Sequence, residues 1–251
     1  MTAAGWAPSL SLGERLKFAL VPPTLYYRMR ARRELGRGEA ELKLLPSLLD
    51  PKRNSIDVGA NKGVYTYWMQ RHSRHVYAYE PNPKIFRILR AGARGNVTVS
   101  SAALSDGAGK RGLRIPKTAS GYSNQGASLD YDKVGPAYGE VEVDVRRLDD
   151  EGLADIGFIK IDVEGHEFAV LEGGRALIAR DRPTLLIEIE EAHNRRPIED
   201  SLARVTALGY AGFALFGGVL RSLDFFDPEA HHRAAPDPAD YIYNFLFFPK
   251  K

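Results

Sequence analysis

The strongest candidate for ligand binding is a turn that follows a short apolar run and precedes a helix-length segment, with the sequence Asp57-Val58-Gly59-Ala60-Asn61-Lys62-Gly63. Glycines in such a turn let the backbone approach a ligand closely, and the first N–H groups of the following helix point towards it. The spacing is Gly-x-x-x-Gly, whereas a dinucleotide fingerprint needs Gly-x-Gly-x-x-Gly. Asn61 can adopt the left-handed conformation, and the acid at Asp57 suits a cationic ligand better than a phosphate. The alternative is an ordinary strand-to-helix turn that Asn61 caps.

Glu80 is the second candidate, because it ends the next apolar run along the chain. In a doubly wound sheet its carboxylate would lie beside the first turn, where it can accept both ribose hydroxyls of an adenosine. Pro81-Asn82-Pro83 restricts the chain directly after it, and we expect Asn82 to cap the following helix. The alternative is a glutamate that is merely solvated at the end of its strand.

A pair of carboxylates, Asp162 and Glu164, follows the apolar run 158–161 and precedes a helix expected to start near Gly165-His166. Asp162 could orient an acceptor, accept its proton or hold the amino end of a cofactor. Carboxylates this close can raise the pKa of one of them into a useful range. The alternative is that both acids cap the helix. His166 could be a general base, although a helix N-terminus disfavours its protonated form.

The other ionisable residues to consider are Lys160, His193 and the pair His231-His232. Lys160 alternates with Asp162 along its strand, so it should be buried and need a partner, and we expect an ion pair with Glu188. His193 lies just past the Glu188 run and is another candidate base in the acceptor region. The pair His231-His232 has no carboxylate at a recognisable ligand spacing, so we predict no metal site there.

Short β-rich runs alternate with helix-length segments past Leu49, which is typical of βαβ units and a parallel sheet. Between 106 and 150 the pattern changes to short strands around a polar segment, 119–129, which we expect to be an excursion over the active-site edge. At the end of the chain, we expect two strands, at 210–216 and 241–248, to form an antiparallel pair. The expected strands are 55–58, 75–80, 97–101, 112–115, 141–145, 158–161 and 184–190, and the expected helices are 62–72, 82–94, 166–180 and 198–208.

The polar segment offers hydroxyls and amides that could hydrogen-bond a polyhydroxylated acceptor, or it could be an ordinary solvated loop. These side chains are Tyr122, Ser123, Asn124, Gln125 and Ser128.

Length and composition limit the classes of protein that fit. With 251 residues, 44% hydrophobic and 27% charged, the chain suits one large globular α/β domain, divided into an N-terminal extension (1–50) and a main domain (51–251). It has no cysteine, which excludes disulfides, thiolate zinc sites and a cysteine nucleophile. Charged residues in the first twenty positions argue against a signal peptide, so we expect a cytoplasmic location. No uncharged stretch is long enough to span a membrane.

The net charge of +3 does not favour nucleic acid as a partner. Residues 10–33 nevertheless carry six cations and one acid among apolar residues, a pattern that could lie on an anionic membrane surface. A dimer contact, a lid over the acceptor and cations that simply face water are the alternatives. If Tyr26, Tyr27 and the neighbouring arginines border the cleft, they would suit a phosphate or nucleotide on a sugar.

Several segments, taken in their order along the chain, resemble the FkbM family of S-adenosylmethionine-dependent methyltransferases. The resemblance covers about 54–191, and Lys62 departs from it, because many members have a small or aliphatic residue there. The segments that carry it are 57–65, Tyr79-Glu80-Pro81-Asn82-Pro83, Ala103-Leu104-Ser105-Asp106, 159–167, Ser128-Leu129, 145–150 and 186–189.

The resemblance implies a Rossmann-like class I methyltransferase fold, with a mostly parallel seven-stranded sheet and an antiparallel terminal strand. It also implies S-adenosylmethionine as cofactor and a hydroxyl oxygen as methyl acceptor, often on a sugar or a polyketide-like alcohol. The expected catalytic residues are Asp162, Glu164 and His166, and the expected cofactor site comprises Asp57, Gly59, Ala60, Asn61, Gly63, Glu80, Pro81, Asn82, Ser101, Ala102 and Asp162.

The sequence therefore predicts an O-methyltransferase that acts on a sugar or glycoconjugate hydroxyl, with no metal site, and a homo-oligomer is compatible with it. A small secondary-metabolite alcohol is the alternative acceptor. A nucleotide-binding or scaffold module without catalysis is the alternative from another class.

Overall fold

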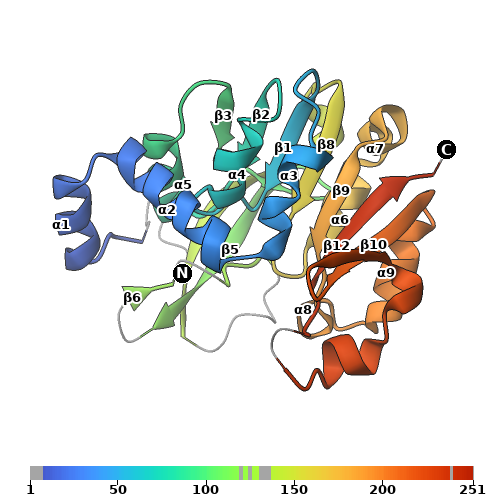
Figure 1. Ribbon diagram of the computed structural model, residues 1–251. Coiled ribbons are helices and arrows are strands. Elements are labelled where there is room, and N and C mark those ends of the chain that lie inside the picture. Colours follow the sequence, from blue (N-terminus) through green and yellow to red (C-terminus); the bar gives the residue numbers. More distant parts are fainter. Residues whose placement is uncertain (1–7, 119–120, 124–125, 130–136, 238–239, 251) are drawn as a thin grey trace.

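An eight-stranded sheet forms the centre of the computed structural model, which describes residues 8–118, 121–123, 126–129, 137–237 and 240–250 (Figure 1). Its strand order is β11-β10-β12-β9-β8-β1-β2-β3. The strands are β1 (Asn54–Val58), β2 (Val76–Tyr79), β3 (Val97–Ser100), β8 (Ile156–Ile161), β9 (Thr184–Glu188), β10 (Tyr210–Phe216), β11 (Val219–Ser222) and β12 (Asn244–Pro249).

The strand order reverses between β1 and β8. From β1 the chain runs outward through β2 to β3, and from β8 it runs the other way to β9, with all these neighbours parallel. The loops that leave β1 and β8 therefore diverge, which opens a crevice beyond the carboxyl ends of the strands. All five residues of β1 are buried, as expected for a strand in the middle of a covered parallel sheet.

The end of the sheet contains the expected antiparallel pair. β12 lies antiparallel between β9 and β10. The sheet has one strand more than predicted, because β11 forms a hairpin with β10 through Gly217-Gly218. β11 is a four-residue edge strand with mostly exposed side chains, so its sequence carries little strand signal.

Helices connect the parallel strands. The predicted helix 166–180 is broken in two at Gly174, whose φ of −111° and ψ of 14° are not helical. Glycines are required here, since a Cβ at Gly173 would overlap the carbonyl oxygen of Ser105 and one at Gly174 would press on Leu148. The helices after β1 are α4 (Val64–Met69), α5 (Pro83–Gly92), α6 (Glu167–Gly173), α7 (Arg175–Asp181), α8 (Glu191–Asn194) and α9 (Ile198–Thr206), with short helical turns at Leu148–Asp150, Leu223–Phe225 and Glu229–Arg233.

The expected excursion between 106 and 150 is a small second sheet. Its order is β4-β7-β5-β6, with bounds β4 (Ala103–Leu104), β5 (Gly109–Thr118), β6 (Gly121–Tyr122) and β7 (Tyr138–Arg146). Alternate residues of β5 and β7, such as Leu113, Ile115 and Val143, are buried, so one face packs and the other is solvated. The strands are longer than the sequence predicted, because their outer residues are charged.

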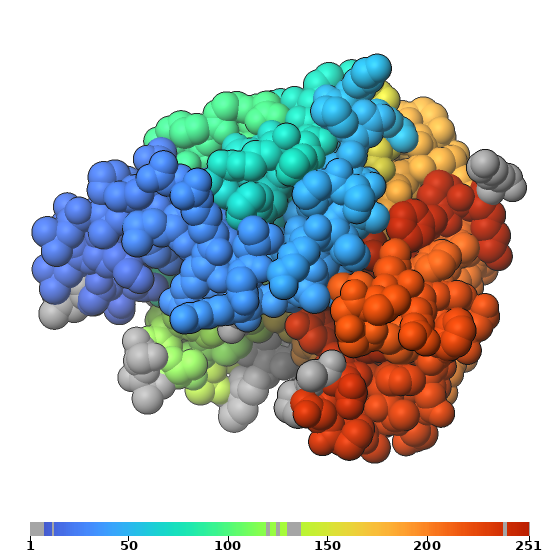
Figure 2. Space-filling view, in the orientation of Figure 1, coloured from blue at the N-terminus to red at the C-terminus, as the bar shows by residue number. Residues whose placement is uncertain are grey.

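The N-terminal segment consists of α1 (Leu12–Leu20), α2 (Pro23–Arg37), a 3₁₀ turn (Ala40–Lys43) and α3 (Leu45–Leu48). α2 packs on α4 and α5, where it buries Tyr27 and Ala31. α1 is held to α5 by an ion pair between Glu14 and Lys84 at 3.0 Å. Figure 2 shows this segment, in blue, as a continuous surface from one end of the molecule towards its middle.

The outer face of the N-terminal segment carries exposed Leu16, Leu20 and Met29 near exposed cations such as Arg15 and Lys17. Binding to an anionic membrane surface requires this arrangement, and such a contact stays a prediction. No described helix has the length and apolarity needed to cross a bilayer.

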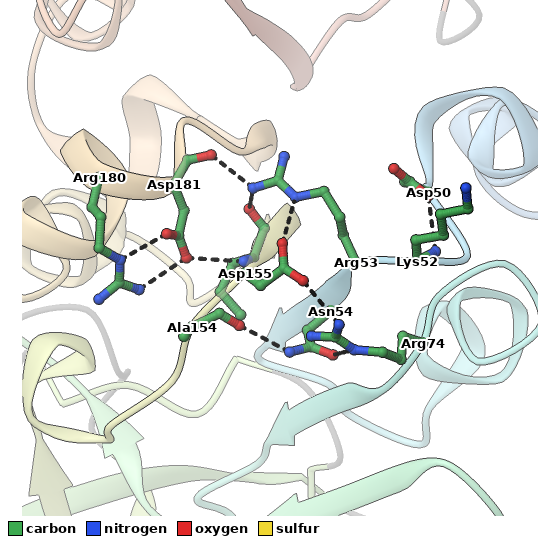
Figure 3. A network of polar contacts seen from close by, with 10 residues as sticks. Asp50, Lys52, Arg53, Asn54, Arg74, Ala154, Asp155, Arg180 and Asp181 are labelled. Atoms are coloured by element: carbon green, nitrogen blue, oxygen red, sulfur yellow. Dashed lines mark hydrogen bonds and ion pairs between the residues drawn. The ribbon is translucent and has the colours of Figure 1, made fainter.

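A polar network joins the strands at the edge of the sheet opposite the crevice (Figure 3). The guanidinium of Arg53 pairs with Asp155 at 3.2 Å and donates to the carbonyl oxygens of Ile156 and Asp181. The Asp181 carboxylate accepts from the backbone N–H of Ile156 at 2.9 Å and pairs with Arg180 at 2.7 Å. This network ties the start of β1 to the start of β8 and to the end of α7.

Candidate functional site

Two adjoining cavities lie beyond the carboxyl ends of β1, β2, β8 and β9. They share Gly59, Asn61, Asp162 and Glu164, so these residues form the junction between them. The first cavity is also lined by Val58, Tyr79 to Asn82, Ala102 to Leu104, Leu113, Gly126, Ala127, Leu129, Val163 and His166. The second is also lined by Arg30, Glu34, Gly38, Glu39, Leu42, Asp57, Ala60, Lys62, Val64, Tyr65, Lys160 and Glu188.

Glu80 is fixed at the edge of the first cavity by two backbone hydrogen bonds. Its Oε2 accepts from the N–H of Asn61 and its Oε1 from the N–H of Asn82, both at 2.8 Å. Each oxygen keeps acceptor capacity for a further donor. The side chain is only 7% exposed, so the alternative of a solvated glutamate is wrong. Burial raises the pKa of Glu80 to about 7, against the lowering effect of the two backbone N–H groups.

Asn82 provides a donor beside this carboxylate. Its Oδ1 accepts from the N–H of Lys84 at 3.1 Å and caps α5, as predicted. Its Nδ2 is buried and has no hydrogen-bond partner among the described residues. A buried amide without a partner is costly. The first cavity offers a polar ligand the two oxygens of the Glu80 carboxylate as acceptors, and this buried amide lies beside them.

The far end of the first cavity is apolar and suits a flat aromatic ring. Ala102, as predicted, lies in this wall, whereas Ser101 is exposed and does not line the cavity. Leu113 and Leu129 complete the wall from the second sheet and the segment that pairs with it. The sequence did not predict these two leucines, because only the long-range pairing of the excursion brings them to the cavity.

The glycines of the first turn make room for neighbouring protein atoms, and Gly59 also lines both cavities. Both glycines have a φ of 79°. A Cβ at Gly59 would overlap the carbonyl oxygen of Asp162, and one at Gly63 would overlap Leu89 and Tyr27. Gly63 is accordingly absent from both cavity walls, while Gly59 draws the ends of β1 and β8 together.

Asn61 adopts the predicted left-handed conformation, with a φ of 48°. It does not cap α4, whose N-cap is Gly63. Its Oδ1 accepts instead from the N–H of Lys62 at 2.8 Å. Ala60 is placed in the wall of the second cavity.

Asp57 lies at the bottom of the second cavity and is fully buried. Its Oδ2 accepts from the hydroxyl of Thr66 at 2.5 Å, and its Oδ1 has no hydrogen-bond partner among the described residues. Burial raises the pKa of Asp57, and the nearby charge of Lys160 opposes this rise. A cationic donor in the cavity would satisfy the free oxygen, as the sequence suggested.

Lys160 pairs with Asp162, and not with Glu188 as predicted. The Lys160 Nζ lies 2.7 Å from the Asp162 Oδ2 and 4.6 Å from the centre of the Tyr65 ring. The side chain is 3% exposed, so the prediction of burial is correct. Burial lowers the pKa of Lys160, but attraction to Asp162, Glu39 and Asp57 outweighs it and the pKa is raised. Lys160 therefore remains charged and holds Asp162 at the junction.

Glu164 stands at the junction next to His193. The His193 Nε2 lies 3.3 Å from the Glu164 Oε2. The backbone of Glu164 has a φ of 54°, which is strained for a residue with a side chain and common at functional sites. Burial raises the pKa of the Glu164 carboxyl, and the charge of His193 opposes the rise. The two predicted candidates are thus brought into contact.

A cluster of Glu188, Glu190 and His193 has ligand atoms within 4.8 Å of one another, close enough to hold a metal ion. The sequence did not predict it, since the fold must first place α8 against the end of β9. Two of the three residues already have protein partners: Glu190 accepts from the Tyr241 hydroxyl at 2.6 Å, and His193 contacts Glu164 and Glu190.

The other three histidines considered in the sequence analysis, His166, His231 and His232, have structural partners. His166 lines the first cavity only, and its Nε2 lies 2.9 Å from the Ser105 Oγ, which donates to Asp106. His232 accepts from the N–H of Glu191 and contacts the carbonyl oxygen of Ile242. His231 accepts from the N–H of Asp227.

Among its described residues, the polar excursion contributes small and apolar residues to the cavities. Gly126 and Ala127 line the first cavity, whereas Tyr122, Ser123 and Ser128 line neither of the two. Asn124 and Gln125 fall outside the described residues. In the N-terminal segment, Arg30 reaches the second cavity, but Tyr26 and Tyr27 do not.

Comparison with known proteins points to one family. A family model described as Methyltransferase FkbM domain matches residues 57–225. The 31-O-demethyl-FK506 methyltransferase FkbM of Streptomyces tacrolimicus is 31% identical over 187 residues, which cover 61% of this chain and 69% of that protein. Methyltransferase 1 of Beauveria bassiana is 28% identical over 141 residues, which cover 47% of this chain and 57% of that protein.

A solved structure agrees in fold. Methyltransferase FkbM from Methylobacillus flagellatus KT superposes with a TM-score of 0.52 at 19% identity, over 83% of this chain and 47% of that chain. The predicted fold class is confirmed by this likeness and by the strand order. The match spans about half of that chain, so the rest of that protein has no counterpart here.

Proposed function

Because the chain belongs to the FkbM family of methyltransferases, we propose that it transfers the methyl group of S-adenosylmethionine to a hydroxyl oxygen of a sugar or glycoconjugate. The family predicted from the sequence is thereby confirmed. The observation that carries the cofactor assignment is the Glu80 carboxylate, which two backbone N–H groups hold at the wall of the first cavity.

The first cavity fits the nucleoside part of this cofactor. Glu80 would accept the two ribose hydroxyls, with Pro81 and Asn82 beside it, and Ala102, Leu113 and Leu129 would enclose the adenine. When bound, the cofactor supplies an electrophilic methyl group on a sulfonium whose thioether leaves as a neutral group. The protein must therefore align the acceptor oxygen and remove its proton.

Glu164 is the residue that we propose as proton acceptor. It lies at the junction of the cavities, its pKa is raised by burial, and His193 at 3.3 Å can share the proton that it takes up. Asp162 is engaged by Lys160 at 2.7 Å, so we assign it to binding and orientation. His166, in the first cavity alone, would contact the nucleoside and not the acceptor.

The polar lining of the second cavity supports a hydroxylated acceptor. Glu34, Glu39 and Glu188 offer acceptors for several hydroxyl groups, as a sugar would require. A small polyketide-like alcohol is the second candidate, because the relative from Streptomyces tacrolimicus is named as the methyltransferase of 31-O-demethyl-FK506. In that name the position left without a methyl group is an oxygen, which also supports O-methylation here.

Two measurements test the proposal. Calorimetry should show binding of S-adenosylmethionine and S-adenosylhomocysteine, and absence of both would contradict the cofactor assignment. A sugar nucleotide, a lipid-linked sugar and a macrolide-like alcohol should then be offered with radiolabelled cofactor. Turnover of the alcohol alone would favour the second candidate, and cofactor binding without turnover of any broad acceptor panel would favour a module without catalysis.

A further inference from the structure

Two cations that have no partner among the described residues face the second cavity. Arg30 comes from α2 and Lys62 from the turn after β1. Within the described residues neither side chain has a hydrogen bond or an ion pair, and the Nε of Arg30 is buried. Burial lowers the pKa of Lys62 to about 8, with a further lowering by the charge of Arg30 and an opposing effect of Glu14. Two like charges held together in this way would be stabilised by an anion.

The same cavity is also lined by carboxylates. Asp57 is fully buried, its Oδ1 has no hydrogen-bond partner among the described residues, and Asp162 is beside it at the end of β8. The cavity therefore combines the cations Arg30 and Lys62 with the carboxylates Asp57 and Asp162, and Glu34 of α2 and Lys160 of β8 line it as well. An α-amino acid, with its carboxylate and its ammonium group, matches this combination of charges.

The position of the cavity relates this pattern to the cofactor. The second cavity adjoins the first through Gly59 and Asn61. A ligand that places its nucleoside against Glu80 can thus extend an amino acid end towards Asp57 and Lys62. S-adenosylmethionine has this composition, with one carboxylate as its only anionic group.

On the basis of the function proposed above, we infer that Arg30 and Lys62 bind the carboxylate of the cofactor's methionine portion, while Asp57 and Asp162 face its ammonium group. Arg30 lies outside the family match, which begins at residue 57. The N-terminal helix α2 is thus a part of the cofactor site, and not only a cover for the sheet.

An anionic acceptor, such as a sugar phosphate, fits these cations less well. The second cavity has Glu34, Glu39, Asp57, Asp162, Glu164 and Glu188 against three cations, Arg30, Lys62 and Lys160. A phosphate with up to two negative charges would be repelled by this excess of carboxylates. The cofactor carries a sulfonium and an ammonium next to its carboxylate, so its net charge suits an acidic cavity.

Calorimetry with two ligands tests the inference on the full chain. S-adenosylhomocysteine has the amino acid end, and 5′-methylthioadenosine has the same nucleoside without it. Arg30→Gln and Lys62→Gln should each weaken S-adenosylhomocysteine binding about tenfold, because each removes a charged donor to the carboxylate of the ligand. Binding of 5′-methylthioadenosine should change less than about twofold. Arg33→Gln, an exposed position on the same helix with the same change in charge, is the control.

The outcomes separate the two proposals. If the wild type binds neither ligand, the proposed function fails. If it binds both and the substitutions leave S-adenosylhomocysteine affinity unchanged, or weaken both ligands equally, the inference fails while the function stands. Thermal unfolding of each variant shows whether it is folded, and Arg30→Lys should recover part of the affinity if charge at this position is what matters.

Discussion

The Oε2 of Glu80 accepts a hydrogen bond from the backbone N–H of Asn61 at 2.8 Å, which joins the end of β2 directly to the turn after β1. The left-handed backbone of Asn61 is what points this N–H at the carboxylate. The ribose-binding group and the turn are therefore one unit, and a change in either should affect the same binding step.

Replacing Glu80 by glutamine should weaken S-adenosylhomocysteine binding at least about tenfold. An amide has one acceptor oxygen, so one of the two backbone N–H groups, of Asn61 or Asn82, would lose its partner, and a ribose hydroxyl would lose its charged acceptor. Calorimetry measures the loss, and Glu142→Gln on the exposed face of β7 is the control. Unchanged affinity in a folded Glu80→Gln protein would remove the cofactor assignment.

Cofactor affinity should also depend on pH through Glu80. Its pKa in the free protein is raised to about 7, so the carboxylate that accepts the ribose hydroxyls is formed as the pH rises through that value. The dissociation constant for S-adenosylhomocysteine should therefore fall about fivefold between pH 6 and pH 7, because ionisation of Glu80 goes from about one tenth to about one half while Lys62, with a pKa of about 8, stays mostly charged. Titrations at five pH values check this. Glu80→Gln should give a flatter profile, and an equal pH dependence in the variant would assign the effect to another group.

The parts of the site that the sequence predicted are local. Asp57 to Gly63 and Glu80 to Asn82 each follow a strand directly, so strand-end placement alone brings them to one edge of the sheet. Arg30 and Leu113 could not be predicted in the same way. Whether Arg30 faces the cavity depends on how α2 packs on α4 and α5, and Leu113 reaches the wall only after β5 pairs with β7.

The ion-pair partner of Lys160 is another feature that the sequence could not determine. Alternation along β8 correctly predicted that the side chain is buried, but it could not choose between a carboxylate on the next strand and one two residues along the same strand. The structure selects Asp162, because that side chain leaves the strand end on the same face as Lys160. Contacts between Glu164 and His193 likewise depend on α8, a single turn whose position the sequence does not determine.

Glu164→Gln should reduce turnover far more than cofactor affinity. If Glu164 accepts the acceptor's proton, its loss should lower kcat by about 10² to 10⁴, while the S-adenosylhomocysteine dissociation constant stays within about threefold. The acceptor identified in the substrate panel is used for the kinetics, and Glu172→Gln, exposed on α6, is the matched control. Equal losses in turnover and cofactor affinity would make Glu164 a binding residue. A variant with wild-type kcat would transfer the role to another group.

Asp181→Asn should destabilise the protein without affecting ligand binding, because Asp181 belongs to the network at the opposite edge of the sheet (Figure 3). The pKa of Asp181 is lowered, first by the hydrogen bond from Arg180 and also by the N–H of Ile156. A lowered pKa in the folded state means that the carboxylate stabilises the protein above its ordinary value of about 4, and that this contribution is lost as the pH falls further.

Urea unfolding should therefore show Asp181→Asn to be less stable than the wild type by about 1 kcal/mol at pH 7, a modest value because Arg180 is exposed to solvent. The difference should shrink towards zero below pH 4. S-adenosylhomocysteine affinity should be unchanged at pH 7, since the network lies at the opposite ends of the strands from both cavities. Asp144→Asn, exposed on β7, should change neither quantity. A stability difference that persists at pH 3 would show that the carboxylate charge is not its source, and altered ligand affinity would show that the two edges of the sheet are coupled.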